Sequence, residues 1–171
     1  MKLFAAAIAL IGTAIGLATP AYAQKDNVGL AAPTRILTSV TEADLRAIVL
    51  AQGLTIEMAR PHGDVSVQGR TADGLLFVLI GTACASDGVT DCQGVLMQIR
   101  YDSDKRVTLE NVNRANVDYA SITTWWDQSM NTVGFTRYVP LIGGGVTMAY
   151  LRQNLQTLFD VEPLPRAIVF P

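Results

Sequence analysis

Residues 54–80 read LTIEMARPHGDVSVQGRTADGLLFVLI, and this stretch decides the fold. It divides into three short apolar segments, and in the first of them apolar residues recur at every second position, as in a half-buried strand. Asp73-Gly74 is a strong hairpin signal between the second segment, residues 65–70, and the third, residues 75–80. Because tight turns join antiparallel neighbours, the stretch predicts an antiparallel sheet.

The chain on both sides of this stretch predicts more strands and three helices. Further strands are expected over residues 95–101, 119–126 and 133–139, and helices over residues 42–52, from Thr108 to Asn116, and from Thr147 through Phe159. Helices in such a chain should cover one face of the sheet. The sequence therefore predicts an α+β fold with about five or six antiparallel strands and three helices.

The length of 171 residues fits one domain with a leader and a tail. Residues 36–160 form the predicted domain. Residues 24–35 begin with a polar stretch rich in small side chains and are expected to be a flexible N-terminus. Residues 161–171 contain three prolines, which should end helical structure and leave an irregular tail.

Residues 1–23 have the order of a cleavable signal peptide. Lys2 supplies the positive start, and residues 3–18 form an apolar run. Ala21-Tyr22-Ala23 is a small-x-small cleavage site, so cleavage is expected between Ala23 and Gln24. The alternative is an uncleaved membrane anchor, but the apolar run is shorter than the roughly 20 residues that a span needs. The sequence therefore predicts a periplasmic protein with no membrane insertion after cleavage.

Export would give Cys84 and Cys92, the only two cysteines, an oxidising environment. The residues between them are turn-rich and apolar runs flank both sides, so a disulfide between two strands is expected. A redox-active pair is the alternative, but the spacing does not match a C-x-x-C motif. A zinc site needs four ligands, and His62 is the only histidine. We therefore expect no metal and no cofactor.

His62 is also the only histidine that could act as a general base. It follows Pro61 in a predicted turn, where a solvated loop histidine is the simpler interpretation. A catalytic triad would need Ser66 or Ser129 beside it, and no G-x-S-x-G motif is present. The net charge of −2 offers no basic field for a nucleic-acid backbone. The sequence thus predicts neither an enzyme nor a nucleic-acid-binding protein.

Trp125 and Trp126 are adjacent in a predicted strand, so their rings should point to opposite faces of the sheet. One ring can lie in the core, while the other must lie on the far face. That outward ring is either covered by a helix or part of a partner-binding surface. The pair is therefore the candidate partner surface.

Several segments, taken together and in order, carry a family resemblance. They are Gly53-Leu54-Thr55-Ile56-Glu57, Asp73-Gly74-Leu75-Leu76-Phe77, the two-cysteine loop, Val95-Leu96-Met97-Gln98-Ile99-Arg100-Tyr101, Val107-Thr108-Leu109-Glu110-Asn111-Val112-Asn113 and Gly143-Gly144-Gly145-Val146-Thr147. The chain resembles the YbjN-domain family, described as bacterial sensory transduction regulators, over about residues 36–160. Family members tend to carry Trp then Asn in the middle helix, where this chain has Ala115 and Asn116.

The resemblance implies a fold similar to type III secretion chaperones, which is a twisted antiparallel sheet with helices, often dimeric, that binds polypeptide and performs no chemistry. With the leader, it predicts an exported, non-catalytic envelope protein that binds a polypeptide or regulates, with a second copy or a polypeptide as partner. A structural or envelope-assembly accessory is the alternative, and an enzyme is less favoured. A shallow apolar groove or a two-fold interface would favour the first interpretation, and a deep polar pocket would favour an enzyme.

Overall fold

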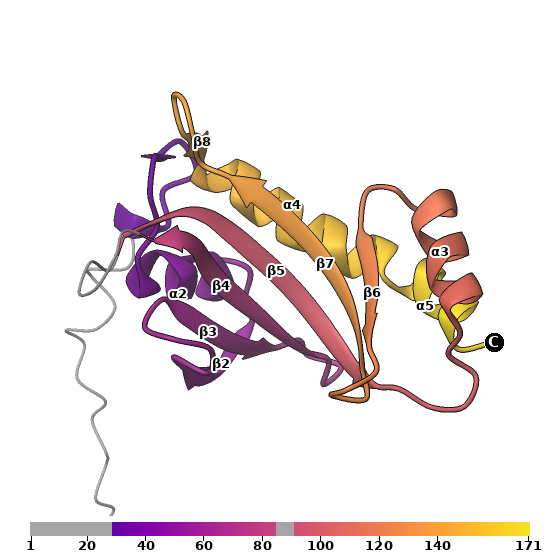
Figure 1. The fold of residues 1–171 in the computed structure, drawn as a ribbon. Helices are drawn as coiled ribbons and strands as arrows, with labels where there is room; N and C mark the ends of the chain where they lie inside the picture. The colour runs from indigo at the N-terminus through magenta and orange to yellow at the C-terminus, as the bar shows by residue number, and fades with distance from the viewer. Residues whose placement is uncertain (1–28, 85–90) are drawn as a thin grey trace, which may run out of the picture.

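A six-stranded antiparallel sheet forms the centre of the molecule (Figure 1). The structure is a computed structural model that describes residues 29–84 and 91–171. The strand order is β2-β3-β4-β5-β7-β6, so strands that follow one another in the chain lie side by side throughout, except where β7 comes between β5 and β6. This arrangement confirms the predicted α+β class. The predicted leader at residues 1–23, with its cleavage site between Ala23 and Gln24, lies outside the described residues.

The expected strands and helices are all present, with bounds that shift by a few residues. The strands of the sheet are β2 (Thr55–Ala59), β3 (Ser66–Arg70), β4 (Leu76–Cys84), β5 (Cys92–Asp102), β6 (Thr123–Asp127) and β7 (Thr132–Pro140), and the expected helices are α2 (Glu42–Leu50), α3 (Leu109–Asp118) and α4 (Met148–Val161). The largest differences are a longer β4 and a later start of β6. Pairing between β4 and β5 continues as far as Cys84 opposite Cys92, whereas residues 119–122 form a turn after α3.

Threonine side chains begin the three expected helices. Thr41 accepts a hydrogen bond at 3.3 Å from the backbone N–H of Asp44, whose carboxylate accepts one in return from the N–H of Thr41 at 2.9 Å. Thr108 and Thr147 each accept a bond at 3.1 Å from the N–H three residues later. These bonds satisfy donors that the first helical turn leaves free, which is why the helices start where the sequence predicts.

Helices α2 and α4 cover one face of the sheet, and the hydrophobic core lies between the two layers (Figure 1). The largest fully buried side chains come from both layers, and they include Leu45 and Ile48 of α2, Leu79 of β4, Met97 and Ile99 of β5, Phe135 of β7, and Leu151 and Leu155 of α4. Along β5 the core residues Val95, Met97 and Ile99 alternate with residues that face away from the helices. This period of two fixes which side chains point into the core.

The expected irregular C-terminal tail is wrong, because residues 163–169 form a helix, α5 (Pro163–Val169). Proline is accepted in the first turn of a helix, where its missing N–H has no partner to lose. Pro165 and Val169 are buried, and α5 packs against α3. Tertiary burial therefore continues the chain as helix beyond α4. Among the described residues, no helix has both the length and the apolar character to cross a membrane.

The described part of the expected flexible N-terminus is anchored to the domain. The carbonyl oxygens of Pro33 and Arg35 accept hydrogen bonds from the N–H groups of Ala149 at 2.9 Å and Met148 at 2.8 Å. Directly afterwards, β1 (Ile36–Leu37) pairs with β8 (Val146–Thr147) in a separate two-stranded sheet. These bonds hold the segment from residue 33 onward against the start of α4.

Candidate functional site

The face of the sheet opposite α2 and α4 has no helix over it in the part of the chain that the structure describes (Figure 1). We call this surface the open face. Its side chains alternate with core side chains along each strand, and the ones used below are Gln68, Arg70, Leu76, Val78, Ile80, Leu96, Gln98, Arg100, Trp125, Thr136 and Tyr138.

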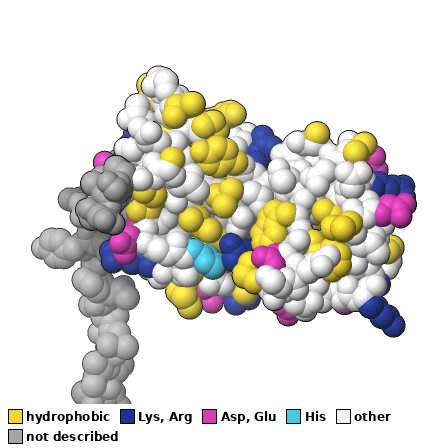
Figure 2. Space-filling view, viewed as in Figure 1, with side chains coloured by type: hydrophobic (Ala, Val, Ile, Leu, Met, Phe, Trp, Pro, Cys, Tyr) yellow, Lys and Arg dark blue, Asp and Glu magenta, His cyan; other side chains and the backbone are white. Residues whose placement is uncertain are grey.

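Apolar side chains form a row across the middle of the open face. Ile80 of β4 lies opposite Leu96 of β5, and Leu96 lies opposite Tyr138 of β7. Tyr138 is 51% exposed, and hydrophobic side chains gather over this face in the same view of the molecular surface (Figure 2). The surface is shallow and apolar, which is the kind of feature that the sequence analysis associated with a binding protein.

The two tryptophans lie on opposite faces, as predicted, and Trp125 is the outward one. Trp125 lies opposite Gly134 on the open face, and its indole N–H donates to the Thr136 hydroxyl at 2.8 Å. A side chain at Gly134 would collide with the ring, because a Cβ there would lie 2.1 Å from ring carbons. Trp126 points the other way and packs against the core. The neighbouring glycine therefore allows the Trp125 ring to lie flat along the sheet.

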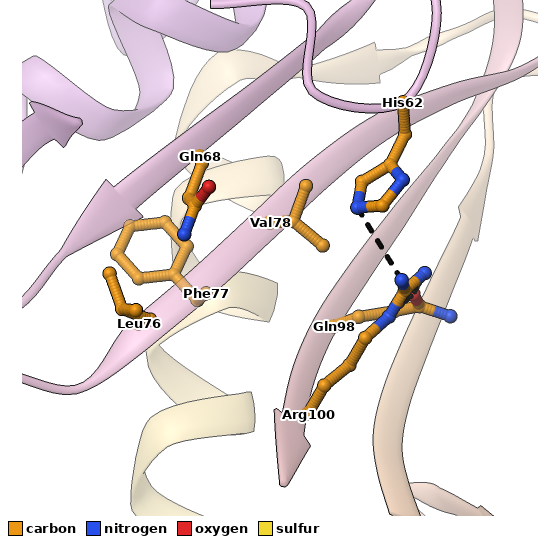
Figure 3. Close-up of a pocket in the computed structure, with 7 residues that line it drawn as sticks. All are labelled: His62, Gln68, Leu76, Phe77, Val78, Gln98 and Arg100. Carbon is orange, nitrogen blue, oxygen red and sulfur yellow. Dashed lines mark hydrogen bonds between the residues drawn. The ribbon is translucent and has the colours of Figure 1, made fainter. Parts of the chain in front are cut away.

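A small hollow opens between the β2–β3 turn and strands β3 to β5 (Figure 3). Arg100 of β5 donates from Nε and Nη2 to the Oε1 of Gln98, at 3.0 and 2.6 Å. Its Nη1 lies 3.4 Å from Nε2 of His62, which reaches over from the turn. The guanidinium carbon of Arg100 also lies 5.9 Å from the centre of the Trp125 ring, within cation–π range. Arg100 therefore links the hollow to the tryptophan.

Both the position of His62 and the charge of Arg100 act on the imidazole. Partial burial and, second, the positive charge of Arg100 lower the pKa of His62 below its usual 6.5. The ring is therefore neutral at pH 7. One ring nitrogen of a neutral imidazole can accept a hydrogen bond, so Nε2 can face the guanidinium without repulsion.

No catalytic triad forms around His62 within the described ranges. The Ser66 hydroxyl accepts from the backbone N–H of His62 at 2.9 Å and donates to the carbonyl of Gly63 at 2.9 Å, so it braces the turn rather than the imidazole. Ser129 lies in the β6–β7 turn, where its hydroxyl donates to Asp127 at 2.6 Å. Residues 29–84 and 91–171 also contain no group of three or more His, Cys, Asp or Glu side chains placed to hold a metal.

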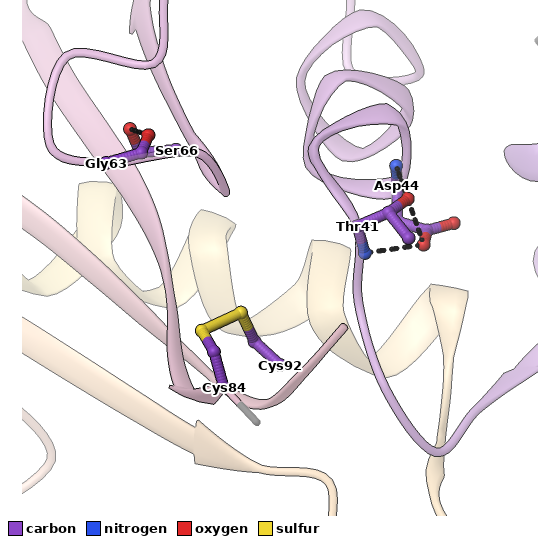
Figure 4. Close-up of a disulfide and its surroundings, with 6 residues drawn as sticks. All are labelled: Thr41, Asp44, Gly63, Ser66, Cys84 and Cys92. Atoms are coloured by element: carbon purple, nitrogen blue, oxygen red, sulfur yellow. Dashed lines mark hydrogen bonds between the residues drawn. A yellow bond between two sulfur atoms is a disulfide. The ribbon is translucent and has the colours of Figure 1, made fainter. Parts of the chain in front are cut away.

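Cys84 and Cys92 form a disulfide (Figure 4). Cys92 begins β5, whereas Trp125 lies in register with Arg100 near the other end of that strand. The two cysteines face each other where β4 ends and β5 begins. Cys92 is fully buried and exchanges two backbone hydrogen bonds with Val40, at 2.8 and 3.0 Å. The disulfide therefore joins β4 to β5 where the chain passes from one strand to the next. The backbone hydrogen bonds between Cys92 and Val40 attach that end of the hairpin to the segment that leads into α2.

Two residues that organise this part of the molecule, Arg100 and Asn116, were not among the predicted site residues. Arg100 was only one charged position in an alternating strand, and nothing in its local sequence showed that His62 would meet it. Asn116 of α3 joins the helix to β6, because its amide donates to the Thr124 carbonyl and accepts from the Thr124 N–H, both at 2.8 Å. The Trp-Asn pattern noted above contained a signal for Asn116. Ala115 beside it is fully buried.

Comparisons with known proteins agree with this architecture. The profile of the YbjN family, described as "Putative bacterial sensory transduction regulator", matches residues 41–161. Among solved structures, the fold is similar to that of YbjN from E. coli, described as "a putative transcription regulator", with a TM-score of 0.57 and 10% sequence identity. That similarity covers 79% of this chain and 93% of the E. coli chain. A search of curated proteins found no match.

Proposed function

The chain belongs to the YbjN family, and from that premise we propose that it is an exported, non-catalytic regulator that works by binding a polypeptide on the open face. The observation that carries the proposal is the exposed apolar and aromatic surface on a sheet face without a helix. A row of half-buried and exposed side chains, with Trp125 at one side, gains free energy when a partner excludes water from it.

The family description supports a regulatory role, and the net charge of the chain indicates which kind of partner would receive the signal. The family is described in terms of sensory transduction, which requires a signal to pass from one molecule to another. A net charge of −2 argues against direct contact with a nucleic-acid backbone. A polypeptide partner is therefore the more suitable recipient of the signal.

The periplasmic part of the proposal is supported by the leader and by the disulfide. Residues 1–23 have the pattern of a signal peptide, and disulfides persist in oxidising compartments. A protein of the bacterial envelope fits both features.

Site-specific photo-crosslinking in the periplasm tests this function. A photoreactive residue placed at Tyr138, on the open face, is compared with one at Val117 on α3, which is 72% exposed and is not part of the open face. We expect a polypeptide adduct at position 138 that is absent at 117 and is lost when Trp125→Ala is added. The proposal fails if the two positions give the same adducts or if Trp125→Ala leaves the adduct unchanged.

A further inference from the structure

The hollow between the β2–β3 turn and strands β3 to β5 contains an arginine whose charge is not matched by a carboxylate. Seven arginines of the described chain form ion pairs with Asp or Glu within 4 Å. One of them, Arg70, lies on the open face as well and pairs with Glu57 at 2.9 Å. Within the described ranges, the side-chain hydrogen bonds of Arg100 go only to the Gln98 amide oxygen and the His62 ring, and its one ring contact is with Trp125. Its full positive charge is therefore available to a ligand.

The contacts of Arg100 leave unused N–H donors on the Nη1–Nη2 edge of its guanidinium, although Nη1 also lies 3.4 Å from His62 Nε2. The amide oxygen of Gln98 accepts hydrogen bonds from Nε and Nη2 of Arg100, and Gln98 is only 6% exposed. The buried amide therefore fixes the plane of the guanidinium. The edge formed by Nη1 and Nη2 still has N–H donors, and this is the edge that binds a carboxylate through two parallel bonds. Gln98 therefore positions the guanidinium in the wall of the hollow, where Nη1 faces His62 (Figure 3).

The size and walls of the hollow limit what can occupy it. Its volume is about 170 Å³, below the roughly 300 Å³ at which pockets for small-molecule ligands begin. Leu76 and Val78 of β4 give it apolar walls, and Gln68 of the neighbouring strand β3 lies beside them (Figure 3). This space suits the short apolar stem and the charged end of one acidic side chain.

Neither of the two acidic residues nearest to Arg100 along the strands, Asp102 and Asp127, forms an ion pair with it. Asp127 lies two residues beyond Trp125, and its carboxylate accepts N–H bonds from Ser129 at 2.9 Å and Met130 at 3.1 Å. Asp102 lies two residues along β5 from Arg100, which corresponds to about 7 Å in a strand. Neither carboxylate comes within the 4 Å of an ion pair with Arg100, as the ion pairs of the described residues show.

We propose that this hollow binds an Asp or Glu side chain of the polypeptide that occupies the open face. The inference rests on the proposed function, since it names the chemistry that the same face selects. A side chain is favoured over a free carboxylate because the hollow is continuous with the apolar surface. The Trp125 ring, 5.9 Å from the guanidinium, would hold the neighbouring part of the same ligand. Arg100 thus supplies selectivity, and the apolar row supplies contact area.

Selection from a phage-displayed library of random 12-residue peptides tests the inference. The wild-type protein is compared with Arg100→Gln and with Arg70→Gln, a matched control whose arginine already has a carboxylate partner on the same face. We expect wild type and Arg70→Gln to enrich peptides with Asp or Glu beside apolar residues. Arg100→Gln should still enrich apolar peptides but lose the acidic preference. The affinity for an acidic peptide should fall about tenfold or more with Arg100→Gln, as expected for a charge-assisted hydrogen bond.

The other outcomes reject the acidic side chain as the ligand, either alone or together with the proposed function. Binding of apolar peptides without acidic preference, or an acidic preference that survives Arg100→Gln, overturns this inference and leaves the proposed function standing. Failure of wild type to enrich any peptide overturns both. Displacement of the acidic peptides by free glutarate at matching affinity shows a small-molecule site and overturns the assignment to a side chain. A dimer in sedimentation that Arg100→Gln dissociates, with no peptide enriched, shows a second copy as the occupant and also overturns it.

Discussion

At the scale of single residues, the adjacent tryptophans should respond differently to substitution. Trp126 packs against the core, so we expect Trp126→Ala to lower the free energy of unfolding by about 3 kcal/mol. The buried indole N–H of Trp126 has no hydrogen-bond partner among residues 29–84 and 91–171, so Trp126→Phe should cost much less. Trp125→Ala should cost less stability than Trp126→Ala but should weaken partner capture. Urea unfolding and crosslinking measure both effects, and equal stability losses with unchanged capture would contradict the assignment.

At the same scale, the pKa of His62 depends on the charge of Arg100. Burial and the guanidinium together hold the pKa of His62 below 6.5. Arg100→Gln removes the charge but leaves most of the burial, so the pKa of His62 should rise and yet stay below 6.5. Titration of the single histidine by NMR measures the value directly. An unchanged pKa would show that the two groups do not interact in solution. Because the folded-state pKa is lowered, this histidine should reduce stability as pH falls through 6.5.

At the scale of elements, Asn116 fixes α3 against the edge strand β6. Asn116→Ala removes both hydrogen bonds to the Thr124 backbone and leaves these backbone groups without their partner. We expect a loss of about 2 kcal/mol in the free energy of unfolding. Asn113→Ala on the exposed side of the same helix is the control, and it should be close to neutral. Equal losses for the two variants, measured by urea unfolding, would mean that the bonds to Thr124 add no stability, because alanine has the higher helix propensity and cannot itself cause a loss.

The disulfide makes a prediction about the whole molecule and its compartment. It closes a loop between residues separated by 8 positions, which in the chain-entropy model stabilises the fold by about 2–3 kcal/mol. Protein recovered from the periplasm should show no free thiol when labelled under denaturing, non-reducing conditions. A version without residues 1–23, kept in the cytosol, should show two labelled cysteines and a lower Tm. Two free thiols in periplasmic material would reject the role of the bond in the exported protein.

At this scale the sequence predicts what is local and misses what depends on distant contacts. Alternating side chains and the Thr41, Thr108 and Thr147 caps act within a few residues, so the strands and helix starts were predicted closely. Helix α5 was missed because its formation depends on burial against α3, which no local pattern encodes. Alternation placed the tryptophans on opposite faces but could not show which face α2 and α4 would cover. The hollow was missed for the same reason, since His62 and Arg100 are 38 residues apart.

Because the Trp125 ring lies flat over Gly134, the residue at position 125 of β6 limits which residue position 134 of β7 can accept during evolution. While the ring is present, no side chain fits at position 134, because even a Cβ would lie 2.1 Å from it. Once the ring is lost, that restriction ends, and a β-branched residue at 134 would improve the strand. Relatives should therefore retain an aromatic residue and glycine as a pair or lose both together. In a double-mutant cycle, Gly134→Val should be destabilising on its own and tolerated beside Trp125→Ala. The residue found at position 134 in a relative should therefore indicate whether that relative still has an aromatic ring on the open face.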